Sequence, residues 1–419
     1  MGPLESANKL KSQGRMPQAL HLLENADIQE SEQGPALAAL AEMYLHAGNP
    51  SRTLDCATQA RNLGHEPLAM LHVQALANRV LGQEQKSRSY AEQILATDPC
   101  HQGAKDLMLL LDGQSIRPET REKVLRLQAK KSPLIISIRS PSDKECDPAM
   151  RRMWGDHWVK EELSIEFRKL GLTTSDRNPD IILQLFGSPP KKLPENTYNI
   201  VWVYSHPDMI NPRNIRPFDK ITCAAVSFIS KLDSFGYLNS EFMPACTSKT
   251  PFKAELIHDM IFLGNARRSR SDGRKVVMDM RTTNLDFKVW GNLWEQLLPS
   301  ENYGGLYWDY ERLEELYASA RITLNDHHPD MAREGFISNK VFDILASGGF
   351  LISQANTGLK SVFGDSVPQY ETPDQLKKLA SYYLNNPPQR EALMQQGQKI
   401  ALSHTYRKCA EQFLSGLRG

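Results

Sequence analysis

The chain has 419 residues, of which 40% are hydrophobic and 24% charged, and its formal net charge is +1. This length exceeds one ordinary core and predicts two or three domains, while the balanced charge argues against nucleic acid as the main ligand. No stretch approaches the roughly 20 apolar residues of a membrane span, and neither a signal core nor metal-binding cysteine spacing is present. We expect a cytoplasmic protein with reduced thiols, for which any membrane contact would be peripheral.

An internal repeat of helical character runs through residues 1–115. Glycines recur 34 residues apart, and small or apolar residues recur at the same interval in further registers: Gly14, Gly48 and Gly82; Ala7, Ala41 and Ala75; Ala19, Thr53 and Ser87; Leu23, Ala57 and Ala91. This period resembles that of tetratricopeptide repeats, in which small residues lie where two helices cross and glycine lies in the turn between them. We predict about three repeats, a capping helix near residues 102–111 and a linking helix at 116–132.

Repeat arrays of this kind stack into a continuous core and present a concave surface. Their usual role is to hold a peptide or a partner protein, so we expect a protein or peptide to bind the array. The alternative is that the array only braces the domain that follows it.

Residues 133–250 alternate strand-like runs with helical stretches. The strand-like runs are apolar and bounded by turn residues: Leu134–Ile138, Asp180–Phe186, Tyr198–Tyr204 and Lys220–Ala225. The alternation predicts a parallel, doubly wound sheet, and such sheets bind ligands at the carboxyl ends of their strands. We therefore expect the loops with Asp156, His157 and His206 to border one crevice. A lone histidine after a strand is more often structural, and this is the alternative for both histidines.

A second set of strand-like runs begins near residue 259, and its first run ends in Gly264-Asn265, followed by Arg267 and Arg268. Glycine lets the backbone come close to a ligand, and arginine can bind a phosphate with two parallel hydrogen bonds. The alternative is an ordinary turn with two solvated arginines. The later run Asp326-His327-His328 invites a metal hypothesis, which we do not favour because adjacent histidines point in different directions.

The most informative stretch is residues 333–353, which predicts a loop, a short helix and a buried strand. Ser338 or Asn339 can cap the helix, because a short side-chain oxygen accepts from free N–H groups of the first turn. Lys340 lies in that first turn, where the helix dipole favours an anion. Asp343 is three residues further on and projects from nearly the same face. Such an arrangement suits a diphosphate beside a ribose diol; the alternative is a capped helix with a solvated lysine and aspartate.

This stretch resembles the donor-site signature of the group 1 glycosyltransferases, which are retaining, nucleotide-sugar-dependent enzymes of GT-B fold. The resemblance rests on Glu334-Gly335-Phe336, on Lys340 and on Phe342–Gly349 before an apolar strand, and it is nearest to the spore-maturation-protein branch. The family pattern has two glutamates with seven residues between them, whereas Glu334 and Asp343 have eight between them. This departure supports an alternative reading as a non-catalytic repeat scaffold with a degenerate GT-B body.

The resemblance also implies roles for residues of this chain. Asp343 would hold the ribose, Glu334 would lie near the sugar or leaving group, and His157 would be catalytic in an acceptor-side loop with Asp156. The other residues that we predict at the donor are Gly264, Asn265, Arg267, Arg268, Trp290, Tyr307, Ser338, Asn339 and Lys340, and His206 is predicted on the acceptor side. No metal or other cofactor is expected, because enzymes of this fold generally work without a bound metal.

The predicted fold is two facing Rossmann-like domains of GT-B type behind an all-α repeat domain. Its predicted segments are residues 1–115 for the repeats, 116–132 for the linking helix, 133–250 for the acceptor domain, 251–390 for the donor domain and 391–419 for a helix that crosses back. The predicted function is retaining transfer of a sugar from a nucleoside-diphosphate sugar to a protein, peptide or surface-glycan acceptor. Inverting transfer on the same fold would need a base such as His157 or Asp156.

Overall fold

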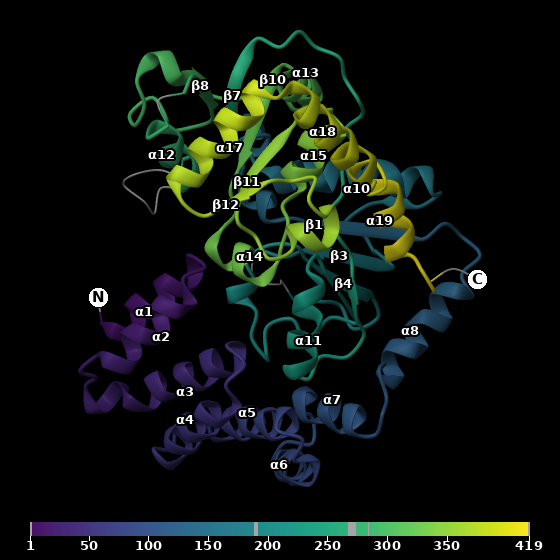
Figure 1. The fold of residues 1–419 in the computed structure, drawn as a ribbon. Helices are drawn as coiled ribbons and strands as arrows, with labels where there is room; N and C mark the ends of the chain where they lie inside the picture. Colours follow the sequence, from purple (N-terminus) through teal and green to yellow (C-terminus); the bar gives the residue numbers. More distant parts are fainter. Residues whose placement is uncertain (1, 188–191, 267–273, 284, 418–419) are drawn as a thin grey trace. The chain divides into compact units, whose positions relative to one another are not determined.

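The computed structural model describes residues 2–187, 192–266, 274–283 and 285–417. Figure 1 shows the course of the chain, which forms two compact units. The first unit comprises Met1–Lys144, Phe167–Met243 and Phe413–Gly419, and the second comprises Glu145–Glu166 and Pro244–Gln412. The domain bounds expected from the sequence stay predictions, as does the facing arrangement of the two sheet domains.

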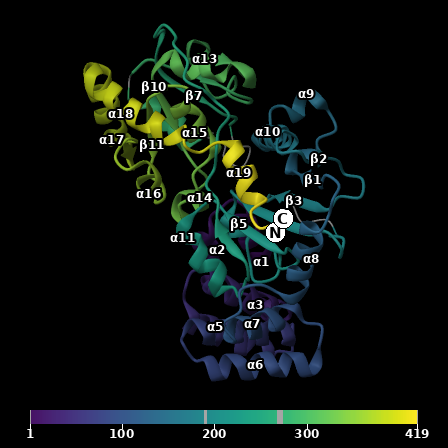
Figure 2. The ribbon, with the colours of Figure 1, turned by 90° about the vertical axis from the view of Figure 1, so that its right-hand side faces the viewer.

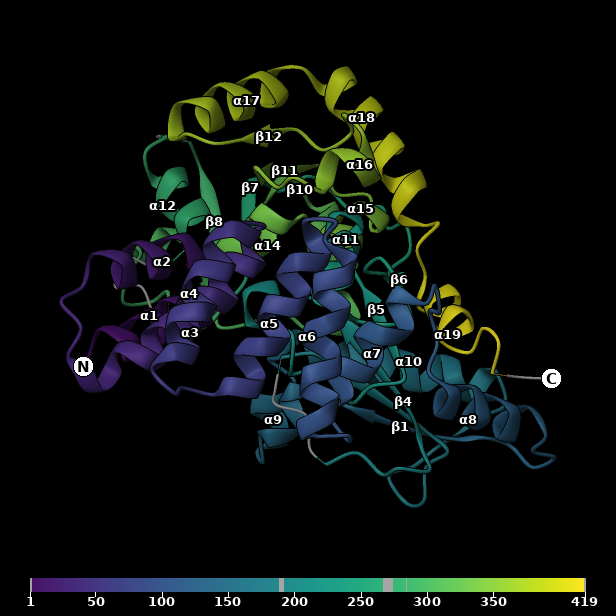
Figure 3. The ribbon, with the colours of Figure 1, turned by 90° about the horizontal axis from the view of Figure 1, so that it is seen from below.

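The first unit opens with a helical array. Its helices are α1 (Pro3–Ser12), α2 (Met16–Asn25), α3 (Glu30–His46), α4 (Pro50–Asn62), α5 (Pro67–Val80), α6 (Glu84–Thr97) and α7 (Gln102–Leu111). Figure 3 shows these helices following one another, and consecutive helices pack together. Gly14, Gly48 and Gly82 each lie between two helices of a pair, with φ of +72°, +74° and +72°, a left-handed conformation that suits glycine.

The nine residues of the other three repeat registers are all buried, from Ala7 to Ala91. Small side chains at these positions let the helices of each pair approach closely. The helix pairs at 34-residue spacing and the helix at residues 102–111 are therefore confirmed, and their assignment to the tetratricopeptide family stays a prediction.

The array packs against loops of the sheet in its own unit. Nε2 of His46 hydrogen-bonds the carbonyl oxygen of Pro207 at 3.1 Å, and the His46 ring lies 5.8 Å and 5.6 Å from the rings of Phe228 and Phe235. Arg79 of α5 donates to both carboxylate oxygens of Asp233, at 2.9 and 3.0 Å. These contacts support the bracing role, while the binding of a peptide or protein by the array stays a prediction.

The sheet of the first unit has the strand order β2-β1-β3-β4-β5-β6, with parallel neighbours throughout. Its strands are β1 (Ile135–Arg139), β2 (Thr173–Thr174), β3 (Ile181–Leu185), β4 (Tyr198–Val203), β5 (Lys220–Cys223) and β6 (Ser240–Phe242). The helical segments around them are α8 (Pro118–Gln128), η1 (Pro141–Lys144), η2 (Pro207–Met209) and α11 (Val226–Ser234). The predicted parallel sheet is confirmed. Helix α8 lies within residues 116–132, whose role as a linking helix stays a prediction.

The second unit contains another parallel sheet, with the order β12-β11-β10-β7-β8-β9. Its strands are β7 (His258–Leu263), β8 (Phe287–Trp290), β9 (Tyr303–Gly305), β10 (Ala320–Asn325), β11 (Leu351–Gln354) and β12 (Gln369–Tyr370). Counted from β7, this is the 3-2-1-4-5-6 order of the Rossmann fold. The pair of Rossmann-like sheets behind a helical region is therefore confirmed.

The remaining helical segments belong to the second unit, except that α10 and α19 end in residues of the first unit. They are α9 (Pro148–Arg151), α10 (Gly155–Lys169), α12 (Lys275–Arg281), η3 (Ser300–Asn302), η4 (Tyr310–Arg312), α13 (Leu313–Ala318), α14 (Pro329–Glu334), α15 (Asn339–Ala346), α16 (Leu359–Phe363), α17 (Pro373–Asn385), α18 (Pro387–Ala401) and α19 (Tyr406–Phe413). Side chains of β7 alternate between two cores. Ile261 packs with residues of α13 and α15, whereas Met260 and Phe262 pack with residues of α12 and α17.

The predicted C-terminal helical region consists of α18 and α19, which follow one another in Figure 2. Tyr406 and Phe413, which we predict as core residues, are 3% and 0% exposed. Phe413 belongs to the first unit, where its ring lies 6.4 Å from that of Phe167 and 5.6 Å from that of Trp202. In the part of the chain that the structure describes, no helix has both the length and the apolarity to cross a membrane.

Candidate functional site

The strand order of the second sheet locates its candidate site. From β7 the chain proceeds outward through β8 and β9 and then returns to β10, on the other side of β7. Parallel sheets bind ligands at the carboxyl ends of the two strands where the order reverses in this way. Here those ends are Leu263, followed by Gly264, and Asn325, followed by Asp326.

Gly264 leaves room at this edge for two cationic side chains. A Cβ atom on Gly264 would lie 2.9 Å from Nη1 of Arg274 and 3.0 Å from Nζ of Lys340. Both cations also lie over the ring of Phe262, with the Arg274 Cζ at 4.9 Å and the Lys340 Nζ at 4.8 Å from its centre. We call Arg274 and Lys340 the cation pair.

The cation pair is held by fixed contacts. Arg274 forms an ion pair with the carboxylate of Asp326, whose side chain is 1% exposed, and donates to the Asp326 carbonyl oxygen at 3.3 Å. Lys340 Nζ donates to the carbonyl oxygen of Leu263 at 2.6 Å. The two cations and Asp326 together carry one net positive charge, and Nε of Arg274 is buried without a hydrogen-bond partner among the described residues. Such an environment attracts an anion.

The first turn of α15 lies at the same edge. Ser338 is the N-cap residue, with extended backbone, but its side chain makes no capping bond. Its Oγ is buried and without a partner within the described ranges, and its N–H donates to Nε2 of His327 at 3.3 Å. Since the N-terminus of a helix favours negative charge, α15 adds to the attraction of the cation pair.

Asp343 occupies a buried polar environment further along α15. It is 8% exposed, and its Oδ1 accepts a hydrogen bond of 2.5 Å from the Thr247 hydroxyl. Burial raises the pKa of Asp343 to about 7; the Thr247 hydrogen bond and the Lys249 charge lower it, and Glu162 and Glu314 raise it further. Lys340 and Asp343 thus contact different neighbours, although both belong to the short helix α15.

Of the four other predicted donor residues of this unit, three contact other groups of the protein and the fourth, Tyr307, is exposed. The amide of Asn339 donates to the Cys246 carbonyl at 2.9 Å and to the Tyr406 hydroxyl at 3.2 Å. Asn265 Oδ1 accepts from the N–H of Asn292 at 2.9 Å. Trp290 is 5% exposed, and its carbonyl accepts from the N–H of Gly264 at 2.9 Å. Tyr307 is 61% exposed and is the most accessible aromatic among these residues.

The predicted catalytic and acceptor-side residues are divided between the two units. Glu334 ends α14 and accepts from Nε of Arg333 at 3.1 Å. Asp156 and His157 lie in the first turn of α10, in the second unit, and burial lowers the pKa of His157. His206 belongs to the first unit and adopts a left-handed conformation with φ of +56°. Arg267 and Arg268 lie outside the described residues, and all these assignments stay predictions.

Arg274 is the residue of this site that sequence reasoning missed. It is the N-cap residue of α12 and follows the Gly264-Asn265 loop by nine residues. The sequence signal for Arg274 is a basic residue at the start of the helix that follows a strand ending in Gly-Asn. Arg267 and Arg268 are basic residues nearer to that strand end, and they fit the same pattern. The contact with Asp326, 52 residues away in sequence, has no local signature.

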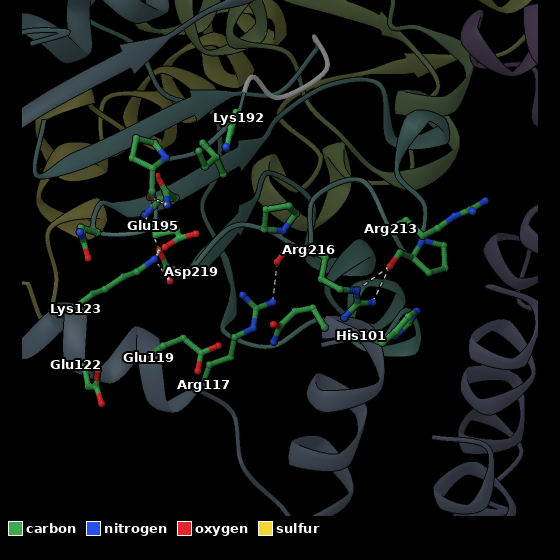
Figure 4. Close-up of a pocket in the computed structure, with 18 of the residues that line it drawn as sticks. His101, Arg117, Glu119, Glu122, Lys123, Lys192, Glu195, Arg213, Arg216 and Asp219 are labelled. Atoms are coloured by element: carbon green, nitrogen blue, oxygen red, sulfur yellow. Dashed lines mark hydrogen bonds and ion pairs between the residues drawn. The ribbon is translucent and has the colours of Figure 1, made fainter. Parts of the chain in front are cut away.

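A separate cavity of about 900 Å³ lies in the first unit (Figure 4), where α5, α7 and α8 meet the loops before β4 and β5. Three of the cationic side chains that line this cavity already bind carboxylates of the protein. Arg117 donates to both carboxylate oxygens of Asp106, at 2.7 and 2.8 Å, and Arg216 donates to Asp106 Oδ2 at 2.8 Å. Lys123 likewise pairs with Asp219 at 2.8 Å.

Asp106 holds these two arginines within the protein interior. Its side chain is 0% exposed, and those of Arg117 and Arg216 are each 8% exposed. Burial alone would raise the pKa of Asp106, but the hydrogen bond from Arg117 and the charges of both arginines outweigh it, so the pKa lies below its ordinary value. Because Arg117 also donates to the carbonyl of Arg216 at 2.7 Å, the network joins the array to the sheet of the same unit.

Comparisons with known proteins bear on the second unit. Residues 267–415 match the family model described as Glycosyl transferase-like. This part of the chain is therefore similar in sequence to glycosyltransferases, and it includes the cation pair and α15. No curated protein has a sequence that matches the chain.

Several solved structures are similar at low sequence identity. Sucrose-phosphate synthase from Thermosynechococcus elongatus is 10% identical, over 68% of this chain and 98% of that one, with a TM-score of 0.47. A mutant O-GlcNAc transferase of Thermobaculum terrenum is 11% identical over 99% and 96% of the two chains, with a TM-score of 0.40. The T4 phage enzyme BGT, solved with its UDP-glucose substrate, is 11% identical over 68% and 99%, with a TM-score of 0.44. No residue role is transferred from these proteins.

Proposed function

We propose that the protein is a glycosyltransferase that takes a sugar from a nucleoside-diphosphate sugar. The observation that carries the proposal is the cation pair, Arg274 and Lys340, converging on Gly264 at the strand-order reversal of the second sheet, in a unit with sequence similarity to glycosyltransferases. In this proposal the diphosphate binds to the cation pair and to the first turn of α15. The Asp343 carboxylate accepts hydrogen bonds from the ribose hydroxyls.

The chemistry of transfer explains why fixed cations suit this position. Negative charge on the diphosphate grows as the bond between sugar and phosphate breaks. Cations already held by Asp326 and by the Leu263 carbonyl stabilise that charge without having to reorganise. The resemblance to group 1 enzymes leads us to expect retention of configuration at the sugar. In such a transfer the leaving phosphate oxygen takes the proton from the acceptor hydroxyl, so no protein base is required. The acceptor that we expect is a protein, a peptide or a surface glycan.

Binding of nucleoside diphosphates tests the proposal. We expect calorimetric titration of the full chain with UDP, GDP, ADP and CDP to show one preferred ligand. Lys340→Ala and Arg274→Ala should each weaken it by about tenfold or more, since hydrogen bonds to charged groups are worth about 1.5–3 kcal/mol. A matched control is Lys360→Ala, because the Lys360 side chain is 79% exposed and lies 3.9 Å from its carboxylate partner.

Turnover is the second part of the test. The nucleotide that binds most tightly defines the sugar donors to be assayed, by release of that nucleotide in the presence of candidate acceptors. If none of the four nucleotides bound at millimolar concentration, the glycosyltransferase proposal would be wrong, and the non-catalytic scaffold would become the better account.

A further inference from the structure

The segment Thr247–Lys249 connects to three different helical segments of the second unit within three consecutive residues. The Thr247 hydroxyl donates to Asp343 of α15 at 2.5 Å, and the Ser248 hydroxyl donates to Glu162 of α10 at 2.6 Å. Lys249 Nζ donates to the carbonyl of Tyr310 in η4 at 2.6 Å. Thr247 and Lys249 are 1% and 5% exposed. Thr247 and Lys249 are therefore buried, whereas Ser248 between them is exposed.

The Thr247 hydroxyl has one orientation available to it. Its oxygen accepts the N–H of Lys249 at 2.9 Å, which leaves its own hydrogen for Asp343. The backbone N–H of Thr247 donates to the carbonyl of His404 at 3.0 Å, so the residue is fixed at main chain and side chain alike. As a result, Oδ1 of Asp343 has a fixed partner, whereas Oδ2 accepts no hydrogen bond from the residues that the structure describes.

Lys249 sets the charge around the same carboxylate. Its ammonium group lies 3.7 Å from the centre of the Tyr310 ring and 3.5 Å from Oε2 of Glu314, and its charge favours ionised Asp343. The other titratable groups that act on Asp343 or are acted on by it are Glu162, Glu314, Tyr310, Tyr317, Tyr406 and Cys246. Among the groups in this set, Lys249 is the cation.

We propose that Thr247 is a positioning residue for nucleotide binding: its hydroxyl orients the Asp343 carboxylate so that Oδ2 accepts from the ribose hydroxyls. This inference rests on the proposed function. A carboxylate that is ionised and oriented forms stronger hydrogen bonds with hydroxyl donors than a neutral carboxyl group does. The segment that enters the second unit at Pro244 would in this way become part of the donor site.

The test distinguishes binding of the ribose hydroxyls from binding of the rest of the nucleotide. The probes are the ribonucleoside diphosphate that binds most tightly among UDP, GDP, ADP and CDP, and its 2′,3′-dideoxy form. Thr247→Val removes the hydroxyl at nearly constant volume, Thr247→Ser keeps it, and Ser248→Ala is the matched control because it removes a neighbouring hydroxyl that does not contact Asp343. Thermal denaturation of each variant checks that the fold is retained.

We expect Thr247→Val to weaken the ribonucleotide by about tenfold and to leave the dideoxynucleotide unchanged. Thr247→Ser and Ser248→Ala should both bind like wild type. The affinity of wild type for the ribonucleotide should fall as the pH is lowered through 7, and Thr247→Val should move this fall to higher pH, because it removes the hydrogen bond that favours the ionised form.

Other results would overturn the inference. Equal weakening of both nucleotides in Thr247→Val would indicate a general structural effect, and unchanged binding would exclude a positioning role. If wild type bound the ribo and dideoxy forms equally, the contact between Asp343 and the ribose would be wrong while the diphosphate site stood. If wild type bound none of the four nucleotides, the proposed function itself would fail. Should Thr247→Val not fold, Thr247→Ala provides the same comparison.

Discussion

The network around Asp106 allows a quantitative prediction for the first unit. In Asp106→Asn the side chain keeps its shape but loses its charge, so that Arg117 and Arg216 keep their positive charges in the interior without a carboxylate. Asp106 is 0% exposed and accepts hydrogen bonds from both arginines at 2.7–2.8 Å. Removing one partner of a buried ion pair costs about 3–5 kcal/mol. For a unit of this size we therefore expect the melting temperature to fall by roughly 6–20 °C.

Calorimetry with a matched exposed pair checks this value. The control is Asp112→Asn, which breaks the 2.8 Å ion pair between Arg88 and Asp112, whose side chains are 37% and 49% exposed. Exposed pairs contribute about 0–1 kcal/mol, so the control should melt close to wild type. Hydrogen exchange should show the loss of protection in α7 and in the loop before β5. A change in Asp106→Asn no larger than that of the control would refute the argument that this network braces the array.

Two further predictions concern the second unit. Gly264→Ala should weaken nucleoside diphosphate binding by about tenfold or more, because the new Cβ would lie within 3.0 Å of both cations. Calorimetric titration measures this loss of affinity. The control is Gly364→Ala, which should bind normally because Gly364 has φ +58° and no atom lies within 4 Å of the new Cβ. Asp343 has a folded-state pKa of about 7, above its unfolded value, so its contribution to stability is present at low pH and is lost as the pH rises toward 7. Relative to Asp343→Asn, wild type should therefore lose melting temperature between pH 4 and pH 7, and a constant difference between the two proteins over this range would contradict the assignment.

Much of the fold could be predicted because its main strands are buried on both faces. Runs such as Ile181–Leu185 and Tyr198–Val203 are mostly apolar and are buried along their whole length, as is typical of central strands in a parallel sheet. The edge strands β9 and β12 were not predicted. They have three and two residues, and β9 contains two glycines, so they lack the length over which an apolar pattern can be recognised.

The candidate site could be predicted only where its signal was local. The sequence correctly predicts Lys340 at the helix start, because Ser338 occupies the N-cap position, although its side chain forms no capping bond, and Gly348 follows the end of the helix. The support of Asp343 by Thr247 joins residues 96 positions apart, and no local pattern of threonine indicates such a contact. Asn339 was predicted to contact the donor because a side-chain amide can hydrogen-bond a ligand. In the structure, its amide instead contacts Cys246 and Tyr406.

The discontinuous composition of the two units has a consequence for synthesis of the protein. Along the chain, Glu145–Glu166 of the second unit precedes Phe167–Met243 of the first unit. The last segment of the first unit begins at Phe413, after Pro244–Gln412 of the second unit. On the ribosome, Trp202 and Phe167 therefore emerge long before the ring that packs against them. Domains usually fold in order as they emerge, but here neither unit can finish its core until almost the whole chain has been translated. Premature termination after α18 would thus leave the earliest-made sheet with exposed aromatic side chains.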